Sequence, residues 1–205
     1  MNKVIHAAVR RDLARLEAAL GDAADGDRSR AAALARAWAN LRDQLRHHHT
    51  QEDTLLFPVL VELGADSSLV EAMESEHQAM SRALDGIDGA MSSYATSGSS
   101  DDATDAALAV RRGSVVVDHH LAHEEGELEP FMMAHQDTPQ WQAAARQLRK
   151  QPPLVAGRFF AWIQDGADPE AQAWLDAEVP KPVRFVLSRV FGRSYHRDIA
   201  PVWRA

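Results

Sequence analysis

The amino-acid sequence predicts an all-α protein, an antiparallel up-and-down four-helix bundle with extra short C-terminal helices packed on its outside. Two observations predict the bundle. Apolar residues recur at steps of three and four along four separate stretches, which is the spacing of one buried helix face. A His-x3-Glu pattern also occurs twice, at His48 and Glu52 and again at His120 and Glu124. The second half of the bundle therefore repeats the first.

The first half contains two predicted helices. In residues 2–20, His6 and apolar side chains alternate at steps of three and four, so they share one face. The Gly/Asp-rich stretch 21–27 ends this helix. A second helix covers about 29–63, and Pro58 is expected to bend its last turns.

The second half follows the same plan. After a loop at 64–67, Ser68 with Glu71 three positions later predicts a capping box that begins the third helix. A polar stretch at 96–102 is expected to be a flexible linker. The fourth helix then runs to about Met133.

We assign residues 1–136 to the bundle and residues 137–205 to a C-terminal helical extension. Thr138 and Asp168 are each followed by Pro, which combines an N-cap residue with proline in the first helical turn. These segments have too few buried positions for a second bundle. They are therefore expected to pack on the outside of the first.

Polar residues interrupt the apolar faces of the bundle at six positions: His6, His48, Glu52, His77, His120 and Glu124. A single core histidine is usually structural, but six polar residues in matching positions of two repeats predict a metal site. A shared cation offsets the free-energy cost of burying two facing carboxylates. Four imidazoles and two carboxylates suit iron, manganese or zinc better than calcium or magnesium. The two glutamates can bridge two ions and leave coordination positions open for a small molecule.

The other histidines and acids are expected to have minor roles. Three histidines lie about 100° from their neighbours on the buried face, so surface or supporting positions are expected: His47, His49 and His119. His123, at about 60°, is expected to support the site by orienting Glu124 or to replace a ligand. Three acids next to the pattern are expected at the bundle surface: Asp53, Glu76 and Glu125.

The pattern H…HxxxE…H…HxxxE over residues 1 to about 135 resembles the hemerythrin-like (HHE cation-binding) family of non-haem di-iron proteins. The stretch from Glu52 to Pro58 and the pair Glu76-His77 are also similar to that family. The C-terminal part looks like the tail of short actinobacterial members. This resemblance implies two iron ions joined by an oxo or hydroxo bridge, with Glu52 and Glu124 as bridging carboxylates.

Two positions depart from the oxygen carriers of that family. Those proteins have a second His one turn before the helix-three ligand, where this chain has Met73. They also have His-x4-Asp on the last helix, where this chain has His120-x3-Glu124. A site with fewer nitrogen ligands is expected to be more open to peroxide or nitric oxide.

The resemblance implies that the protein handles small oxidants, through peroxide decomposition (catalase-like), nitric oxide consumption, or both. Glu52 and Glu124 are the expected catalytic carboxylates, and His123 is a possible proton donor. The alternative is a non-catalytic module that binds or senses oxygen or iron, and the sequence alone leaves enzymatic activity open. A structural bundle with an adventitious cation is the third class. A ferritin-like site needs Glu-x-x-His on two helices, and here the motif occurs only once, ending at His77. The His-Glu-x-x-His motif of zinc hydrolases is absent.

The overall composition limits partners and location. A net charge of −8 argues against nucleic acid as the main partner, and no protein partner is predicted. No run approaches the roughly 18 apolar residues of a membrane span, and the N-terminus lacks a signal-peptide core, so a cytoplasmic location is expected. The absence of cysteine excludes disulfides and thiolate ligands.

The charge is unevenly distributed along the chain. Residues 181–205 contain six basic side chains against the single acid Asp198, a net charge of +5, which leaves −13 for the rest. The simplest interpretation is a basic segment that lies on its own acidic bundle. Docking to an anionic partner or a membrane surface is the alternative.

Overall fold

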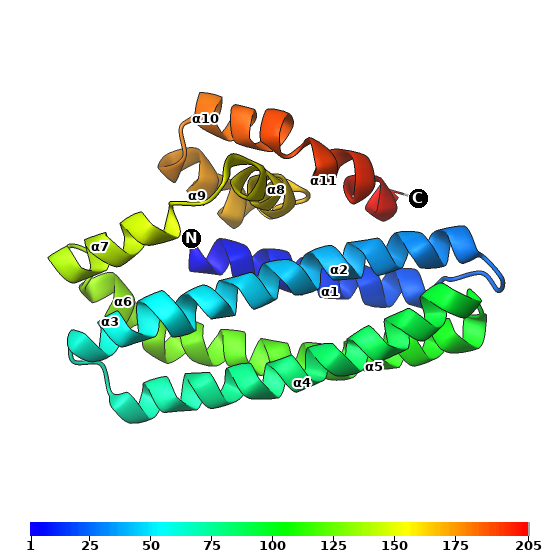
Figure 1. Ribbon diagram of the computed structural model, residues 1–205, viewed down its shortest axis with the longest axis horizontal. Coiled ribbons are helices and arrows are strands. Elements are labelled where there is room, and N and C mark those ends of the chain that lie inside the picture. The colour runs from blue at the N-terminus through cyan, green and yellow to red at the C-terminus, as the bar shows by residue number, and fades with distance from the viewer. Residues whose placement is uncertain (205) are drawn as a thin grey trace.

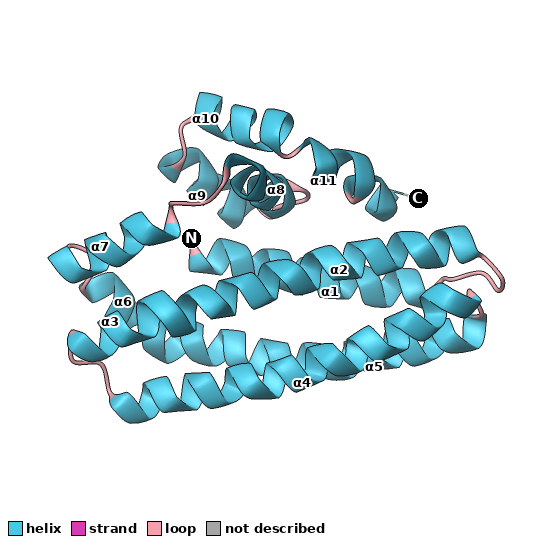
Figure 2. Cartoon of the chain, viewed as in Figure 1, coloured by secondary structure: helices cyan, strands magenta, loops and turns pink. Residues whose placement is uncertain are grey.

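The computed structural model describes residues 1–204, so Ala205, the last residue of the predicted extension, lies outside the described part. All regular elements in residues 1–204 are helical, with no strand (Figure 2). The long helices run alongside one another as a bundle, and shorter helices cover one side of it (Figure 1). The all-α prediction is therefore confirmed.

Four long helices form the bundle: α1 (Asn2–Gly21), α2 (Arg28–Gln51), α4 (Ser67–Ser97) and α5 (Ser100–His123). Each contacts the next along the chain, and α1 also contacts α5, so the four close into a ring around one core. The buried faces carry mainly Leu, Val, Ile, Met and Ala, as the spacing predicts.

The second helix changes its winding where it carries the repeated pattern. The π-helical turn η1 (Glu52–Leu56) follows α2, and the Phe57 amide donates to the Glu52 carbonyl five residues earlier. The helix then continues as α3 (Phe57–Glu62). Pro58 accounts for this turn, because proline has no amide hydrogen and its ring displaces the carbonyl four residues earlier. The predicted bend at Pro58 thus takes the form of a widened turn that begins at a candidate ligand.

The repeat has the same feature. The π-helical turn η2 (Glu124–Leu128) follows α5, and the amide of Glu129 donates to the carbonyl of Glu124. Pro130 stands where Pro58 stands in the first copy, and the helix continues as α6 (Glu129–Ala134). The internal repeat in the sequence is therefore also a repeat of backbone geometry.

Two local predictions were wrong at the ends of α4. Asp66, rather than Ser68, is the N-cap, because its carboxylate accepts the amide of Ser68. The stretch 96–102 is a tight turn rather than a flexible linker. Gly98 ends α4 with φ of 70°, and Ser99 caps α5 by accepting the amide of Asp102. Asp and Ser are both common N-cap residues, so the stretch 66–68 offers more than one possible helix start, which explains the error.

Seven elements make up the C-terminal extension: α7 (Pro139–Leu148), α8 (Pro153–Gln164), α9 (Pro169–Glu178), α10 (Lys181–Phe185), the π-helical η3 (Val186–Phe191), α11 (Arg193–Asp198) and the 3-10 helix η4 (Ala200–Arg204). Thr138 and Asp168 are N-caps, as their Thr-Pro and Asp-Pro pairs predict. Helices α8 and α9 contact α1, and η4 contacts α2, so the extension packs on one side of the bundle (Figure 1).

A buried carboxylate fastens the extension to α1. Asp12 and Trp162 are both fully buried, and the Trp162 indole Nε1 donates to Asp12 Oδ2 at 2.9 Å. Arg11 Nε donates to Asp12 Oδ1 at 2.8 Å, and Arg15 Nη1 does so at 3.2 Å. Both oxygens of this carboxylate therefore have partners within the chain.

The basic C-terminal segment does not pair with the bundle. Arg184 pairs with Asp176, Arg197 with Asp198, and Arg204 with Asp165. Within residues 1–204, no basic side chain after position 180 forms an ion pair with a carboxylate of residues 1–136, so the expected ionic contact with the acidic bundle is not found. Every helix in this range is too short or too polar to cross a bilayer.

Candidate metal centre

All six residues predicted as ligands lie together in the interior of the bundle, and none is more than 8% exposed. They come from every wall of the bundle: His6 from α1, His48 from α2, His77 from α4 and His120 from α5. The two glutamates stand at the first positions of η1 and η2. The π-helical turns thus present a carboxylate at the same level as the imidazoles.

The Nε2 atoms of the four histidines face one another in pairs. Nε2 of His6 lies 3.3 Å from Nε2 of His48, and Nε2 of His77 lies 3.1 Å from Nε2 of His120. A neutral imidazole whose Nδ1 carries the hydrogen has a lone pair on Nε2. Two lone pairs at this distance repel unless a proton or a cation lies between or beside them. The arrangement is therefore suited to a metal ion.

Acids on the outer side of the rings hold the opposite nitrogen atoms. The three contacts are Glu125 Oε1 to His6 Nδ1 at 2.8 Å, Asp53 Oδ1 to His77 Nδ1 at 2.7 Å, and Glu76 Oε2 to His120 Nδ1 at 2.9 Å. A carboxylate at Nδ1 fixes the hydrogen there and turns the Nε2 lone pair inward.

These acids were expected at the bundle surface, and that interpretation missed their role. Each is partly exposed, yet its carboxylate turns inward to a ring. A sequence signal did exist. Asp53 and Glu125 each follow a candidate glutamate ligand, and Glu76 precedes His77. A residue one position from an inward-facing ligand lies at the edge of the buried face, where a long side chain can reach a neighbouring helix.

Glu52 lies between imidazoles from the two halves of the bundle. Its Oε1 is 3.3 Å from His48 Nε2, and its Oε2 is 3.7 Å from His77 Nε2. Burial and the negative charge of Glu124 raise the pKa of Glu52 well above its ordinary value. A carboxylate in such a position gains most from an adjacent cation.

Glu124 occupies the matching position but has an additional partner. Its Oε2 is 3.2 Å from His6 Nε2 and 3.9 Å from His120 Nε2. Its Oε1 accepts a hydrogen bond of 2.9 Å from the Asn2 side chain, a contact that was not expected from the sequence. Burial opposes its ionisation, but the close contact with His6 and the positive charge of that imidazole outweigh burial and lower the pKa of Glu124.

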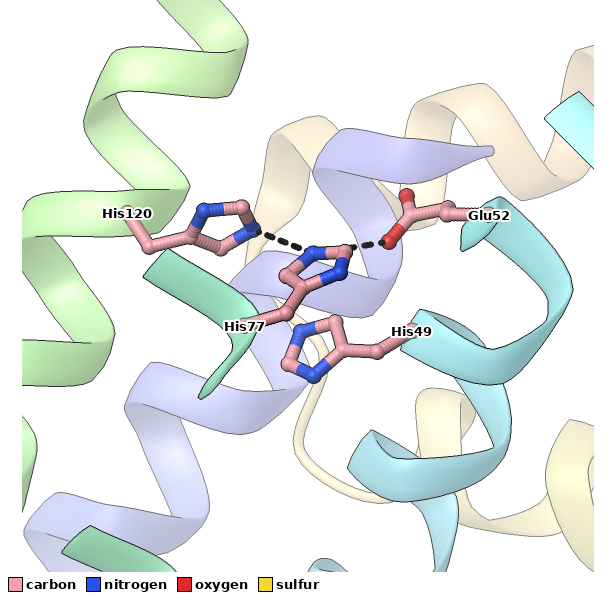
Figure 3. Close-up of side chains that lie close together, drawn as sticks. All are labelled: His49, Glu52, His77 and His120. Carbon is pink, nitrogen blue, oxygen red and sulfur yellow. Dashed lines mark hydrogen bonds and ion pairs between the residues drawn. The ribbon is translucent and has the colours of Figure 1, made fainter. Parts of the chain in front are cut away.

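His49 also belongs to the centre, although it was expected at the surface or in a supporting position. It is buried, and its ring stacks on that of His77 with centroids 4.2 Å apart (Figure 3). Donor atoms of His49, Glu52, His77 and His120 all lie within 4.8 Å of one another. Helix α2 contacts both α1 and α4, so its buried face is wide enough to include both His48 and His49.

A second group contains His6, His48 and Glu124, again with donor atoms within 4.8 Å of one another. The two groups differ by one imidazole. The residue that matches His49 in the repeat is Leu121, which is fully buried in the apolar core. The centre therefore has three histidines on one side and two on the other.

Several buried polar atoms of the centre have no hydrogen-bond partner among the described residues. They are both carboxylate oxygens of Glu52, Oε2 of Glu124 and Nε2 of His49. Leaving such atoms unpaired costs about 1–3 kcal/mol each, and more for charged groups. A cation would satisfy all of them together, so the residues present fit a metal centre.

Three imidazoles of the centre favour the uncharged form at neutral pH. Burial and the neighbouring charge of His6 lower the pKa of His48 to about 3. Burial also lowers the pKa of His49 and His120. A metal ion requires the neutral ring as a ligand, so little proton competition is expected at these three rings near pH 7. At His6, burial favours the neutral ring, but the contacts with Glu124 and Glu125 outweigh burial and raise the pKa, so a metal ion bound there would displace a proton.

The remaining histidines are outside this cluster. His47 and His119 are exposed, as expected. The Nδ1 of His123 lies 2.8 Å from Oε1 of Glu76, so it contacts that acid rather than Glu124. Glu76 thereby joins His123 to His120. Met73, one helical turn before His77, is fully buried and packs in an apolar cluster with residues of α3 and α6.

An open hollow lies at the surface between α2 and α4. Its volume is about 530 Å³, and its lining includes Arg46, His49, Asp53, Glu74 and His77. Two residues of the three-histidine group thus border a space that is reached from solvent. A small molecule could approach the centre from this side without an opening of the bundle.

The bundle region of the chain matches a protein-family model. The family model described as hemerythrin HHE cation-binding domain matches residues 3–132, which include every residue of both donor groups. Neither the curated proteins nor the solved structures give a significant match. The matched range covers more than half of the chain, and the two His/Glu groups within it fit a metal-ion centre. The chain belongs to the hemerythrin HHE cation-binding family.

Proposed function

We propose that the protein is a non-haem di-iron protein that handles small oxidants, with peroxide decomposition as its main activity and nitric oxide consumption as a second. The observation that carries this proposal is the set of inward-facing, unpaired donor atoms in two adjacent groups. Histidine-rich sets with a few carboxylates suit iron among the common metals. When bound, two neighbouring irons supply paired one-electron redox chemistry.

The ligand assignment follows from the two groups. In this proposal His49, His77 and His120 would hold one ion, and His6 and His48 would hold the other. Glu52 and Glu124 would be available to both ions, because each carboxylate lies beside imidazoles from both groups. His49 was absent from the ligand set expected from the sequence and is added to it here.

The chain also offers a route for protons. One oxygen of Glu76 faces Nδ1 of His120 at 2.9 Å, and the other faces Nδ1 of His123 at 2.8 Å. Burial opposes ionisation of Glu76, but its hydrogen bonds with His123 and His120 outweigh burial and lower its pKa. The His123 side chain is 24% exposed, so this line connects a buried ring with solvent. Peroxide decomposition requires such proton movement.

A specific observation supports the alternative of a non-catalytic module that binds oxygen or iron. The absence of an imidazole at Met73 was the sequence argument for turnover. His49 offers an imidazole to the same group, so the site is richer in nitrogen than expected. The proton route through Glu76 favours turnover, and the added imidazole favours reversible binding.

One experiment separates these functions. Iron-loaded protein is mixed with hydrogen peroxide while evolved oxygen is measured, and its optical spectrum is followed under oxygen. We expect oxygen evolution and no long-lived oxygen complex. A long-lived complex in protein that leaves peroxide untouched would establish the binding module instead.

The role of the proton route has a matched control. His123→Gln should lower the rate of oxygen evolution about tenfold with iron content unchanged. His47→Gln, at an exposed position on α2 and without a contact to Glu76, should leave the rate unchanged. Equal rates in both variants would remove His123 from the proposal.

A further inference from the structure

The outer side of the C-terminal extension exposes a row of large apolar side chains. They are Val183 and Phe185 on α10, Val186 and Val190 on η3, and Leu154 at the start of α8. Phe185 is 64% exposed and Leu154 is 69% exposed. The opposite side of η3 packs on α8, so this row is an additional apolar face that the fold leaves uncovered. Such a face usually marks an interaction site.

The same face carries unpaired positive charge. Lys181, Arg189 and Arg193 are exposed, and none forms an ion pair within residues 1–204. No acidic residue occurs between positions 179 and 197. Apolar and cationic side chains therefore share one surface without an intervening carboxylate.

A hollow next to this face combines both kinds of side chain. Its volume is about 570 Å³, and it is lined by Leu154, Val190, Phe191, Arg193, Ser194 and Arg197. Arg193 and Arg197 are one helical turn apart and lie on the same side of α11. Arg197 is paired with Asp198, whereas Arg193 has no ion pair within residues 1–204. A free guanidinium beside apolar side chains suits a phosphate attached to an acyl chain.

We propose that this face, formed by α10, η3 and the start of α8, binds the surface of an anionic phospholipid membrane. A helix with basic and apolar residues on its exposed side can lie in the membrane interface, where apolar groups insert and cations meet lipid phosphates. A second copy presenting the same face would bring cations against cations. The rest of the chain carries a net charge of −13, and the bundle lies on the far side of the extension (Figure 1). That orientation keeps the acidic bundle away from the anionic surface.

Vesicle partitioning tests the proposal. The whole protein is mixed with vesicles of phosphatidylcholine alone or of phosphatidylcholine with phosphatidylglycerol, and bound protein is measured by sedimentation. We expect binding only to the anionic vesicles and a decrease with added salt. R189Q/R193Q should weaken binding about 30-fold, since each arginine near an anionic surface contributes about fivefold. F185S/V186S should also weaken it, because apolar insertion is lost.

Matched controls lie on the bundle. Arg111 and Val115 on α5 are an exposed cation and an apolar residue that is 70% exposed, so R111Q and V115S should leave vesicle binding unchanged. Circular dichroism and iron content verify that every variant is folded. Equal binding to neutral and anionic vesicles, or no binding to either, would overturn the proposal. A dimer that F185S/V186S dissociates would show that the face binds a second copy instead.

Discussion

Two buried carboxylate sites in this protein differ in whether the chain itself provides their partners. Asp12 accepts hydrogen bonds from Trp162, Arg11 and Arg15, and its role is to hold the extension on α1. Glu52 and Glu124 are buried as deeply but keep three oxygens without a hydrogen-bond partner. A buried charge must be compensated. Where the chain provides the compensation the site is structural, and where it does not the site is prepared for a ligand.

The largest effect expected from this difference is on stability when metal is removed. If the centre binds iron as proposed, iron should raise the free energy of unfolding by about 4 kcal/mol when free iron exceeds its dissociation constant about 1,000-fold. Thermal unfolding of iron-loaded and chelator-treated protein at neutral pH measures this. Equal melting temperatures would mean that the two glutamates are compensated in some other way.

The acids that hold the outer ring nitrogens should have the next largest effect. Asp53→Asn and Glu76→Gln remove the carboxylates that orient His77 and His120. Loss of such a partner typically lowers metal affinity about 10–100-fold. Iron titration of both variants should show this, whereas Asp43→Asn, at an exposed position on α2, should bind iron normally.

Replacement of the structural carboxylate Asp12 should lower stability without changing metal binding. Asp12→Asn weakens the hydrogen bonds to Arg11 and Arg15 and should lower the free energy of unfolding by about 2 kcal/mol. Its iron content should remain that of the wild type, because Asp12 is outside both donor groups. Urea unfolding and iron analysis of one preparation test both statements. A loss of iron from this variant would show that the two sites are coupled.

A further effect is a pH dependence of the metal-free protein. The pKa of Glu52 is raised in the folded state. Below about pH 4.5 this carboxyl is protonated in both the folded and the unfolded protein, so it does not reduce the stability of the metal-free protein there. As the pH rises further, only the unfolded state loses this proton, and stability falls by about 1.4 kcal/mol per pH unit until the folded pKa is reached. Glu52→Gln should therefore be more stable than the wild type at pH 7, and this advantage should vanish towards pH 4.5. Urea unfolding across this range measures it.

The bundle was predicted from the sequence, and the six residues predicted as ligands lie together in the structure, because they recur at helical spacing in two repeats. His49 was not predicted to belong to the centre, because only one narrow face of α2 was assumed to be buried. That helix packs on both α1 and α4, so more of its surface is buried. The roles of Asp53, Glu76 and Glu125 also depend on which neighbouring helix each side chain reaches, and spacing along one helix does not contain that information. The same limit applies to the apolar side chains of α10 and η3, which spacing alone would place in a core.

Iron stoichiometry tests the central claim most directly. The wild type, Asp12→Asn and the double variant E52A/E124A are loaded with ferrous iron, freed of unbound metal and analysed for iron per chain. The account predicts two irons in the wild type and in Asp12→Asn, and no binuclear centre in the double variant. Two coupled irons in E52A/E124A would contradict the claim that these unpaired carboxylates hold the metal.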